Sequence, residues 1–446
     1  MKEWFRAFFN PPAAENRLPW RMFWVGFAAR VIFLTAAHKY RIRIHLDHFE
    51  FGWEMGRVAR ALVTGYGYSD PFNGHSGPTA WVPPAYPLLL AGIFKLFGVY
   101  STLSAWVALT VNSLFSAAIA PAVYEIAWRC FGRNARGLKV ALWSGWLWAL
   151  YPAAMQYAVH WIWEMSLTAF LFAWIFVMAL RIRGVGETGA VEAGQTVNQT
   201  AGRWIVFGAG WGLIALSNSS LLLFLPACAI WMLWDVLRAG RIGLALRNAV
   251  LSGVVCIAVV SPWVVRNWYA FHAFVPLRSN FGAEMYEATL PANHGFPWAA
   301  TLPMAETHPS FVRYRQLGEL AYSKEQGVKA NRQIKADPGL WVAHIVQRVY
   351  FFWFSVPHPI DHLFEEFLRV LNYGWISVAS LLGLALAIRQ RIPAAWLFFW
   401  AFALAPMIYY FVTVQARFRH PLEPLMTVLI VYLFQSAETR RQKVQA

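Results

Sequence analysis

The sequence predicts an all-α polytopic membrane protein with about ten transmembrane helices, and three observations support this fold class. The 446-residue chain is 58% hydrophobic and only 13% charged. It contains 25 tryptophans, a density typical of the aromatic belts at the two interfaces of a membrane protein. Ten apolar stretches, most of them about 18 residues or longer, have the length that a bilayer crossing requires. They are residues 20–38, 102–128, 138–155, 158–181, 203–217, 219–237, 246–264, 368–388, 392–414 and 420–437.

The basic residues predict how these spans are oriented. The net charge of +16 comes largely from arginines between apolar stretches, which indicates orientation in an anionic membrane rather than binding to nucleic acid. Ten spans with both termini in the cytoplasm place every basic cluster on the cytoplasmic side. These clusters are the N-terminus and residues 129–139, 181–203, 238–247, 389–391 and 440–443. We therefore expect a multi-pass protein of a bacterial inner (plasma) membrane, beginning with a retained signal anchor.

Two shorter apolar stretches, 84–97 and 340–354, contain Lys95 and Arg348. Counting both as spans gives twelve and moves the cluster at 129–139 to the opposite side. They are better interpreted as amphipathic helices along the outer interface, although a count of up to thirteen spans stays open.

The pattern divides the chain into three parts. Residues 1–264 form an N-terminal transmembrane module, which includes a first outer loop at 39–101. Residues 265–367 form an outer (periplasmic) region, and residues 368–446 form a C-terminal transmembrane module. The three cysteines indicate no disulfide framework, and no metal-ligand spacing predicts zinc.

The first outer loop carries the densest group of polar residues, including the acids Asp47, Glu50 and Glu54. A helix over 49–63 would place Glu50 and Glu54 on one face, because they are four residues apart. A carboxylate pair beside the membrane suits a general base or a cation ligand. The alternative is a solvated helix face with a Glu54–Arg57 ion pair.

Other polar residues lie where predicted spans meet the outer side. His160 and Glu164 begin the fourth span, and a carboxylate there is costly unless it faces a polar site. Arg266, with Asn267, lies at the outer end of the seventh span, and Arg417 and Arg419 precede the last. Arginines in these positions could hold a lipid phosphate, and the alternative is snorkelling to lipid headgroups.

The order of these features resembles the GT-C superfamily of membrane glycosyltransferases. The chain is most similar to its bacterial branch of protein O-mannosyltransferase-like and lipid A aminoarabinose transferase-like proteins. The resemblance rests on Ala59, Leu62, Gly65 and Gly67 in the first loop, the segment PPAYPLLLAGIFKLFG, the FGR turn at 131–133, Glu164, PWVVRN and RFRHPLEP.

This resemblance implies an inverting sugar transfer on the outer face, in the cell envelope. A polyprenyl-phosphate sugar would donate a hexosyl or pentosyl group to a glycan, lipid or protein acceptor. A first-loop acid would be the base, and arginines would hold the lipid phosphate. Family members usually carry Asp-Glu or Asp-x-Asp in this loop, whereas this chain has DHFEFGWE. The base is therefore open among Asp47, Glu50 and Glu54.

We assign Glu164 as a second acid that orients the acceptor or the sugar, and Arg266, Arg417 and Arg419 as phosphate ligands. Four further residues are candidates for contacts with the sugar or the acceptor: His160, Trp81, Tyr86 and Asn267. No cofactor is predicted, and no motif supports a divalent cation, although one is not excluded.

Two alternatives remain from the sequence. A transporter or flippase of a polar or lipid-linked solute predicts charged residues inside several spans and repeated halves. This chain keeps its polar residues near the outer ends of the spans and shows no repeat. A non-catalytic receptor or assembly protein predicts that the outer acids are dispensable.

Overall fold

The computed structural model describes residues 18–42, 51–132, 134–186, 200–290, 308–356 and 363–445, and these are mainly helical. Within these ranges the only β pairing is an isolated bridge between Ser69 and Pro78. The all-α prediction is therefore confirmed. The helices are α2 (Leu18–Ala36), α3 (Glu54–Val63), α4 (Ala85–Phe97), α5 (Thr102–Phe131), α6 (Ala135–Leu150), α7 (Pro152–His160), α8 (Met165–Arg183), α9 (Ala201–Ala215), η3 (Ser219–Phe224), α10 (Leu225–Arg238), α11 (Ile242–Phe271), α12 (Phe281–Thr289), α13 (Pro309–Leu317), α14 (Glu319–Ala336), α15 (Pro338–Phe354), α16 (Leu363–Arg389), α17 (Ala395–Leu404), α18 (Met407–Phe411), η5 (Ala416–Leu422) and α19 (Glu423–Gln445).

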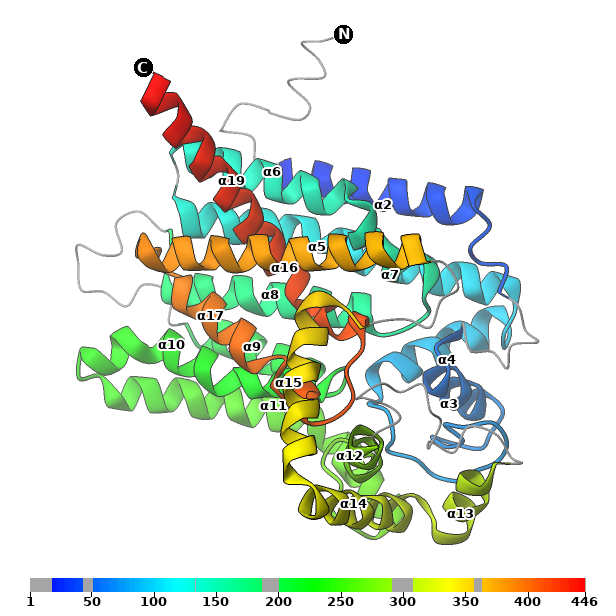
Figure 1. Ribbon diagram of the computed structural model, residues 1–446. Helices are drawn as coiled ribbons and strands as arrows, with labels where there is room; N and C mark the ends of the chain where they lie inside the picture. Colours follow the sequence, from blue (N-terminus) through cyan, green and yellow to red (C-terminus); the bar gives the residue numbers. More distant parts are fainter. Residues whose placement is uncertain are drawn as a thin grey trace.

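The long helices form a bundle around α5, which packs against α2, α6 and α8 (Figure 1). The arginine-rich ends of α8, α10 and α16 lie at one end of this bundle, at the left of Figure 1. Helices α3, α12, α13 and α14 lie toward the opposite end. The basic ends of these three helices therefore lie at the same end of the bundle.

Five helical segments in the described ranges are long and apolar enough to cross a membrane. They are Thr102–Phe131, Met165–Arg183, Ser219–Arg238, Ile242–Phe271 and Phe367–Arg389. The other five predicted spans also contain helices, but these are shorter, less apolar or interrupted. Pro152 begins α7 directly after α6, and Pro406 separates α17 from α18, because proline cannot donate the backbone hydrogen bond that continues a helix.

Arg30, which is fully buried in the bundle, binds the carbonyl groups at the end of α6. Its guanidinium donates to the carbonyl oxygens of Ala149 at 2.8 Å and Trp148 at 3.2 Å, and to the Ser116 hydroxyl at 3.0 Å. Carbonyls at a helix end have no partner within the helix, so Arg30 satisfies groups that would otherwise be costly in an apolar bundle.

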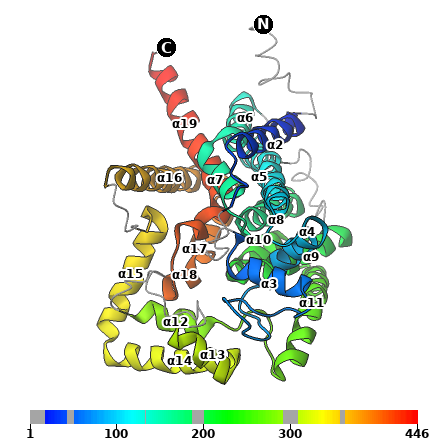
Figure 2. The ribbon, with the colours of Figure 1, turned by 90° about the vertical axis from the view of Figure 1, so that its right-hand side faces the viewer.

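The two shorter apolar stretches also form helices, α4 and α15. Helix α15 runs across the direction of α16 in both Figure 1 and Figure 2. It therefore does not follow the long helices of the bundle. The position of α4 and α15 along the outer interface stays a prediction.

Glu319 joins the first loop to the outer helices. Its carboxylate accepts hydrogen bonds from the Thr79 hydroxyl at 2.5 Å and the Ala80 amide at 2.6 Å. It also accepts from the hydroxyls of Ser279 at 2.5 Å and Tyr314 at 2.7 Å. Burial raises the pKa of Glu319, and these four donors act in the opposite direction. Three separate segments therefore meet at one carboxylate.

We expect Glu319→Ala to lower the free energy of unfolding by about 2–4 kcal/mol, because it leaves several buried donors without an acceptor. Thermal unfolding of the purified protein in detergent measures this effect. The matched control is Glu325→Ala on the same helix, whose carboxylate pairs with Arg313 at 2.7 Å and Lys329 at 3.0 Å near the surface. Such pairs contribute about 0–1 kcal/mol, so equal losses in the two variants would contradict the role of Glu319.

Candidate active site

Glu54 is held at the start of α3 by a tight turn. Gly52 and Trp53 both have positive φ, 84° and 46°, and a Cβ on Gly52 would lie 2.2 Å from the carbonyl oxygen of Ile162. The first loop thus packs directly against the segment that leads into α8. A non-glycine residue with positive φ is strained, and such strain is frequent at functional sites.

The predicted helix over 49–63 begins later than expected. Residues 51–53 form the turn, and α3 starts at Glu54. Asp47 and Glu50 lie outside the described residues, so their geometry and the shared face of Glu50 and Glu54 stay predictions. A solvated helix face, the alternative, does not describe α3, because six of its ten residues are buried and Arg57 is only 3% exposed.

Arg417 lies among three glutamates from distant parts of the chain. Its guanidinium interacts electrostatically with the carboxyl groups of Glu54, Glu164 and Glu284. Glu54 begins α3, Glu164 immediately precedes α8, Glu284 belongs to α12 and Arg417 belongs to η5. We call these four residues the Arg417 cluster. It joins two predicted acids to one predicted phosphate ligand.

Aromatic rings support the guanidinium of Arg417. It lies 3.8 Å from the centroid of the Trp163 ring, and Trp163 stacks on Trp161 with their centroids 5.3 Å apart. Among the described residues, no acceptor hydrogen-bonds to this guanidinium. A guanidinium held by a ring face keeps its N–H groups available for an oxyanion.

The electrostatics of the cluster follow from enclosure. Burial raises the pKa of Glu54 and of Glu164, and the positive charge of Arg417 partly offsets this in both. Burial lowers the pKa of Arg417, and the carboxylates of Glu164 and Glu54 act in the opposite direction. The acids are therefore more basic than exposed carboxylates, which suits proton abstraction.

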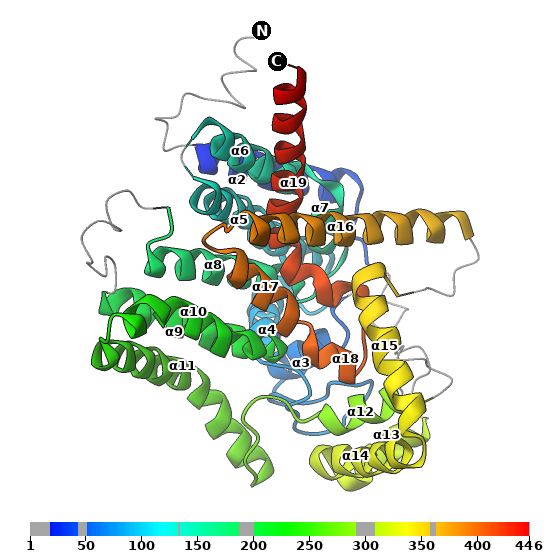
Figure 3. The ribbon, with the colours of Figure 1, turned by 60° about the vertical axis from the view of Figure 1, so that its left-hand side comes forward.

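Helix α12 supplies two acids that the sequence analysis did not single out. The Glu284 carboxylate accepts from the Thr413 hydroxyl at 2.7 Å, which fixes α12 beside the end of α18 (Figures 2 and 3). Glu287 is fully buried, and burial raises its pKa well above the usual range, with Glu284 and Glu54 adding to this effect. Burial therefore favours the protonated form of Glu287. In the sequence, these two acids are distinguished only by their spacing of three residues within the region 265–367.

Arg278, also missed, is a second cation at the cluster. Its Nε donates to the carbonyl oxygen of Trp81 at 3.0 Å, and its charge attracts the carboxylate of Glu164. It lies in the connection between α11 and α12. Glu164 therefore faces two arginines, Arg417 and Arg278.

Arg266 does not join the Arg417 cluster in the described contacts. Its Nη1 donates to the carbonyl oxygen of Thr79 at 2.6 Å and to Asn267 Oδ1 at 2.9 Å, and its Nη2 donates to the carbonyl oxygen of Tyr68. The guanidinium thus binds the backbone of the first loop, which supports a structural role.

Arg419 also points elsewhere. It is 1% exposed and donates to the Tyr373 carbonyl oxygen at 2.9 Å and to the Ser377 hydroxyl at 2.8 Å, while Glu423 lies 3.3 Å away. Arg419 lies in η5, directly before α19, and the sequence did not show the direction of its side chain. Of the three predicted phosphate ligands, Arg417 is the one that interacts electrostatically with Glu54 and Glu164 among the described residues.

The four residues predicted to contact the sugar or the acceptor make contacts within the protein itself. Trp81 and Tyr86 are both 1% exposed, and the Tyr86 hydroxyl donates to Asn112. Asn267 is fully buried and donates to a backbone carbonyl. His160 is exposed and lies beside Phe33. Trp81 reaches the site through the bond between its carbonyl and Arg278, and Tyr86 interacts electrostatically with Glu164.

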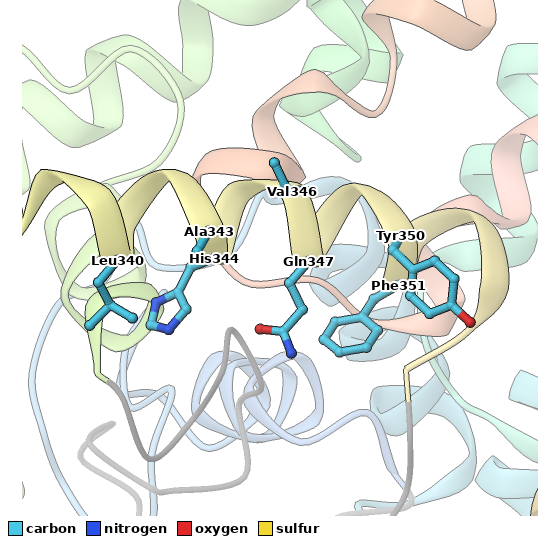
Figure 4. A pocket seen from close by; sticks show the side chains of 7 residues that line it. All are labelled: Leu340, Ala343, His344, Val346, Gln347, Tyr350 and Phe351. Atoms are coloured by element: carbon cyan, nitrogen blue, oxygen red, sulfur yellow. The ribbon is translucent and has the colours of Figure 1, made fainter.

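The described residues contain no group of three or more His, Cys, Asp or Glu side chains that could hold a metal ion. A separate hollow of about 740 Å³ lies along α15 (Figure 4). Leu340, His344, Gln347 and Phe351 are among its lining residues and come from successive turns of that helix. It contains no member of the Arg417 cluster, and its mainly apolar wall does not suit a sugar.

Comparisons with known proteins support the fold. The sequence matches no protein-family model and no curated protein. Among solved structures, it is similar to the oligosaccharyltransferase of Archaeoglobus fulgidus in its apo form, with a TM-score of 0.52 and 13% identity over 96% of this chain and 51% of that one. The same enzyme tethered to an acceptor peptide containing the NVT sequon gives a TM-score of 0.53 and 13% identity, over 96% and 50%.

A third structure is archaeal oligosaccharyltransferase AglB from the same organism, in complex with an inhibitory peptide and a dolichol-phosphate. It gives a TM-score of 0.52 and 14% identity over 95% of this chain and 51% of that one. The chain thus spans about half the length of these enzymes. At this identity the likeness concerns the fold alone, and it agrees with the fold that the resemblance to the GT-C superfamily predicts.

Proposed function

We propose that the protein is an inverting membrane glycosyltransferase that transfers a sugar from a polyprenyl-phosphate donor to an acceptor on the outer face. The observation that carries this proposal is the Arg417 cluster. It combines enclosed carboxyl groups with an arginine whose N–H groups are available, and its members come from four separate segments. A base and a leaving-group ligand are the two parts that such a transfer needs.

In the proposed reaction, Glu54 removes the proton from an acceptor hydroxyl as that oxygen attacks the anomeric carbon. The bond between the anomeric carbon and the phosphate oxygen breaks, and the electron pair leaves with the polyprenyl phosphate. Arg417 and Arg278 stabilise the charge that develops on this phosphate. Glu164, which interacts with both arginines, orients the reacting groups. The proton ends on the Glu54 carboxylate and is then released to water.

The fold comparison supports the donor class, because an archaeal oligosaccharyltransferase with a similar fold was captured with a dolichol-phosphate. Such a lipid presents a phosphate at the membrane surface, where arginines bind it well. Charged groups inside the bundle often bind the solute of a transporter, and Arg30 is a charged group buried in this bundle. Its guanidinium is occupied by four acceptors within the bundle, and this disfavours a transporter.

The test is purified full-length protein in detergent with a panel of polyprenyl-phosphate sugars and candidate glycan, lipid and peptide acceptors. We expect release of polyprenyl phosphate with at least one donor, and Glu325→Gln as a surface control should retain the wild-type rate. If folded wild-type protein releases no polyprenyl phosphate from any donor in the panel, the proposal is wrong.

A further inference from the structure

Helix η5 presents different residues on two sides. Side chains three residues apart in a 3₁₀-helix are eclipsed, so Ala416 and Arg419 share one side and Arg417 and His420 share another. The first pair faces α16: the Tyr373 hydroxyl donates to the Ala416 carbonyl at 2.7 Å, and Arg419 is bound at Tyr373 and Ser377.

The second pair faces α7 and the segment before α8. Arg417 covers the Trp163 ring, and the His420 ring lies 4.6 Å from that of Tyr157. Tyr157 in turn interacts electrostatically with Arg417. His420 is fully buried, so its position is set by the protein rather than by water.

One carboxylate connects the two sides. Glu423 Oε2 lies 2.7 Å from His420 Nδ1, and Glu423 Oε1 lies 3.3 Å from Arg419 Nη2. Both partners are 1% exposed or less, so neither can exchange Glu423 for water without moving the helix. Arg419 Nε and His420 Nε2 are buried without a hydrogen-bond partner among the described residues, so the bonds to Glu423 are the ones that hold this carboxylate between the two sides of η5.

We infer that Glu423 is a positioning residue for Arg417. It locks Arg419 and His420 on either side of η5, which leaves Arg417 over Trp163, where it interacts electrostatically with Glu54, Glu164 and Glu284. Arg419 thus acts through the placement of Arg417 instead of binding the phosphate itself. This inference rests on the proposed function, in which Arg417 holds the phosphate of the donor.

The test is a double-mutant cycle on the dissociation constant for polyprenyl phosphate, measured with full-length protein in detergent. A displacement of about 1 Å is enough for a large loss, so we expect Glu423→Gln to weaken binding by about tenfold to a hundredfold. In an Arg417→Ala background the same change should cost nothing further, because the group that it positions is absent. Ser377→Ala removes one hydrogen-bond acceptor of Arg419, so it should weaken binding of polyprenyl phosphate less than Glu423→Gln does. In the Arg417→Ala background it should also weaken binding no further.

Glu125→Gln is the matched control. Its carboxylate also accepts from two arginines, Arg129 at 2.8 Å and Arg181 at 2.7 Å, at the arginine-rich end of the bundle. We expect it to lower thermal stability without changing the affinity for polyprenyl phosphate.

The positioning role would be overturned if the losses of affinity in Glu423→Gln and Arg417→Ala added in the double variant. It would also be overturned if both Glu423→Gln and Ser377→Ala kept the wild-type affinity. Either result would leave the proposed function in place. Wild-type protein that neither binds polyprenyl phosphate nor releases it from a donor would overturn both.

Discussion

Replacing Glu54 by glutamine should lower the rate of sugar transfer by about 10²–10⁴-fold, the range that general-base catalysis contributes. Glutamine keeps the shape of the side chain and cannot accept the proton of the acceptor hydroxyl. Binding of polyprenyl phosphate should stay within a few-fold of wild type, because Arg417 and its aromatic support are unchanged. Single-turnover release of polyprenyl phosphate at saturating donor separates these two effects.

The pH dependence provides a second readout of the same residue. Burial raises the pKa of Glu54, and the carboxylate is the active form of a base. The rate of transfer should therefore fall as the pH falls through this raised pKa, and the fall should begin at a higher pH than an exposed carboxyl would give. Glu54→Gln should lose this limb of the profile, whereas Glu325→Gln should retain it.

Full activity in Glu54→Gln would place the base elsewhere in the first loop. Asp47→Asn and Glu50→Gln then become the decisive variants, since the sequence analysis leaves the base open among these three acids. A loss confined to one of them would move the base to that residue and leave Arg417 as the phosphate ligand.

The sequence was sufficient for the helices and for part of the site. Long apolar stretches bounded by arginines predict helices, because every backbone group in a bilayer needs a partner within its own segment. Glu164 and Arg417 could be assigned to the candidate site because a charged residue beside a predicted span is costly unless it faces a polar group or cavity. The interruptions at Pro152 and Pro406 were less evident, since hydropathy continues across both prolines.

What the sequence could not show was the direction of individual side chains. Arg417 and Arg419 are two residues apart and equally placed before the last span, yet one faces the glutamates and the other faces α16. Arg278 and Glu284 come from an outer region without hydropathy periodicity to orient it. Their place in the site depends on the packing of α12 against the chain near Thr413, a contact across 129 residues.

Arg417→Ala should lower the rate of transfer by about 10²–10³-fold, the loss usual for one oxyanion ligand. It should also weaken binding of polyprenyl phosphate, because a charge-assisted hydrogen bond in an enclosed site is lost. Arg417→Lys should recover only part of both, since lysine keeps the charge and lacks the planar fork.

Arg266→Ala separates this role from a structural one. Arg266 binds the Thr79 and Tyr68 carbonyls of the first loop, so its loss should lower thermal stability. The protein that remains folded should still bind polyprenyl phosphate. Calorimetric titration with polyprenyl phosphate and thermal unfolding of the same samples measure both properties. If Arg266→Ala lost the affinity and Arg417→Ala kept it, the phosphate would be held at the backbone of the first loop, and Arg417 would serve only to balance the three glutamates around it.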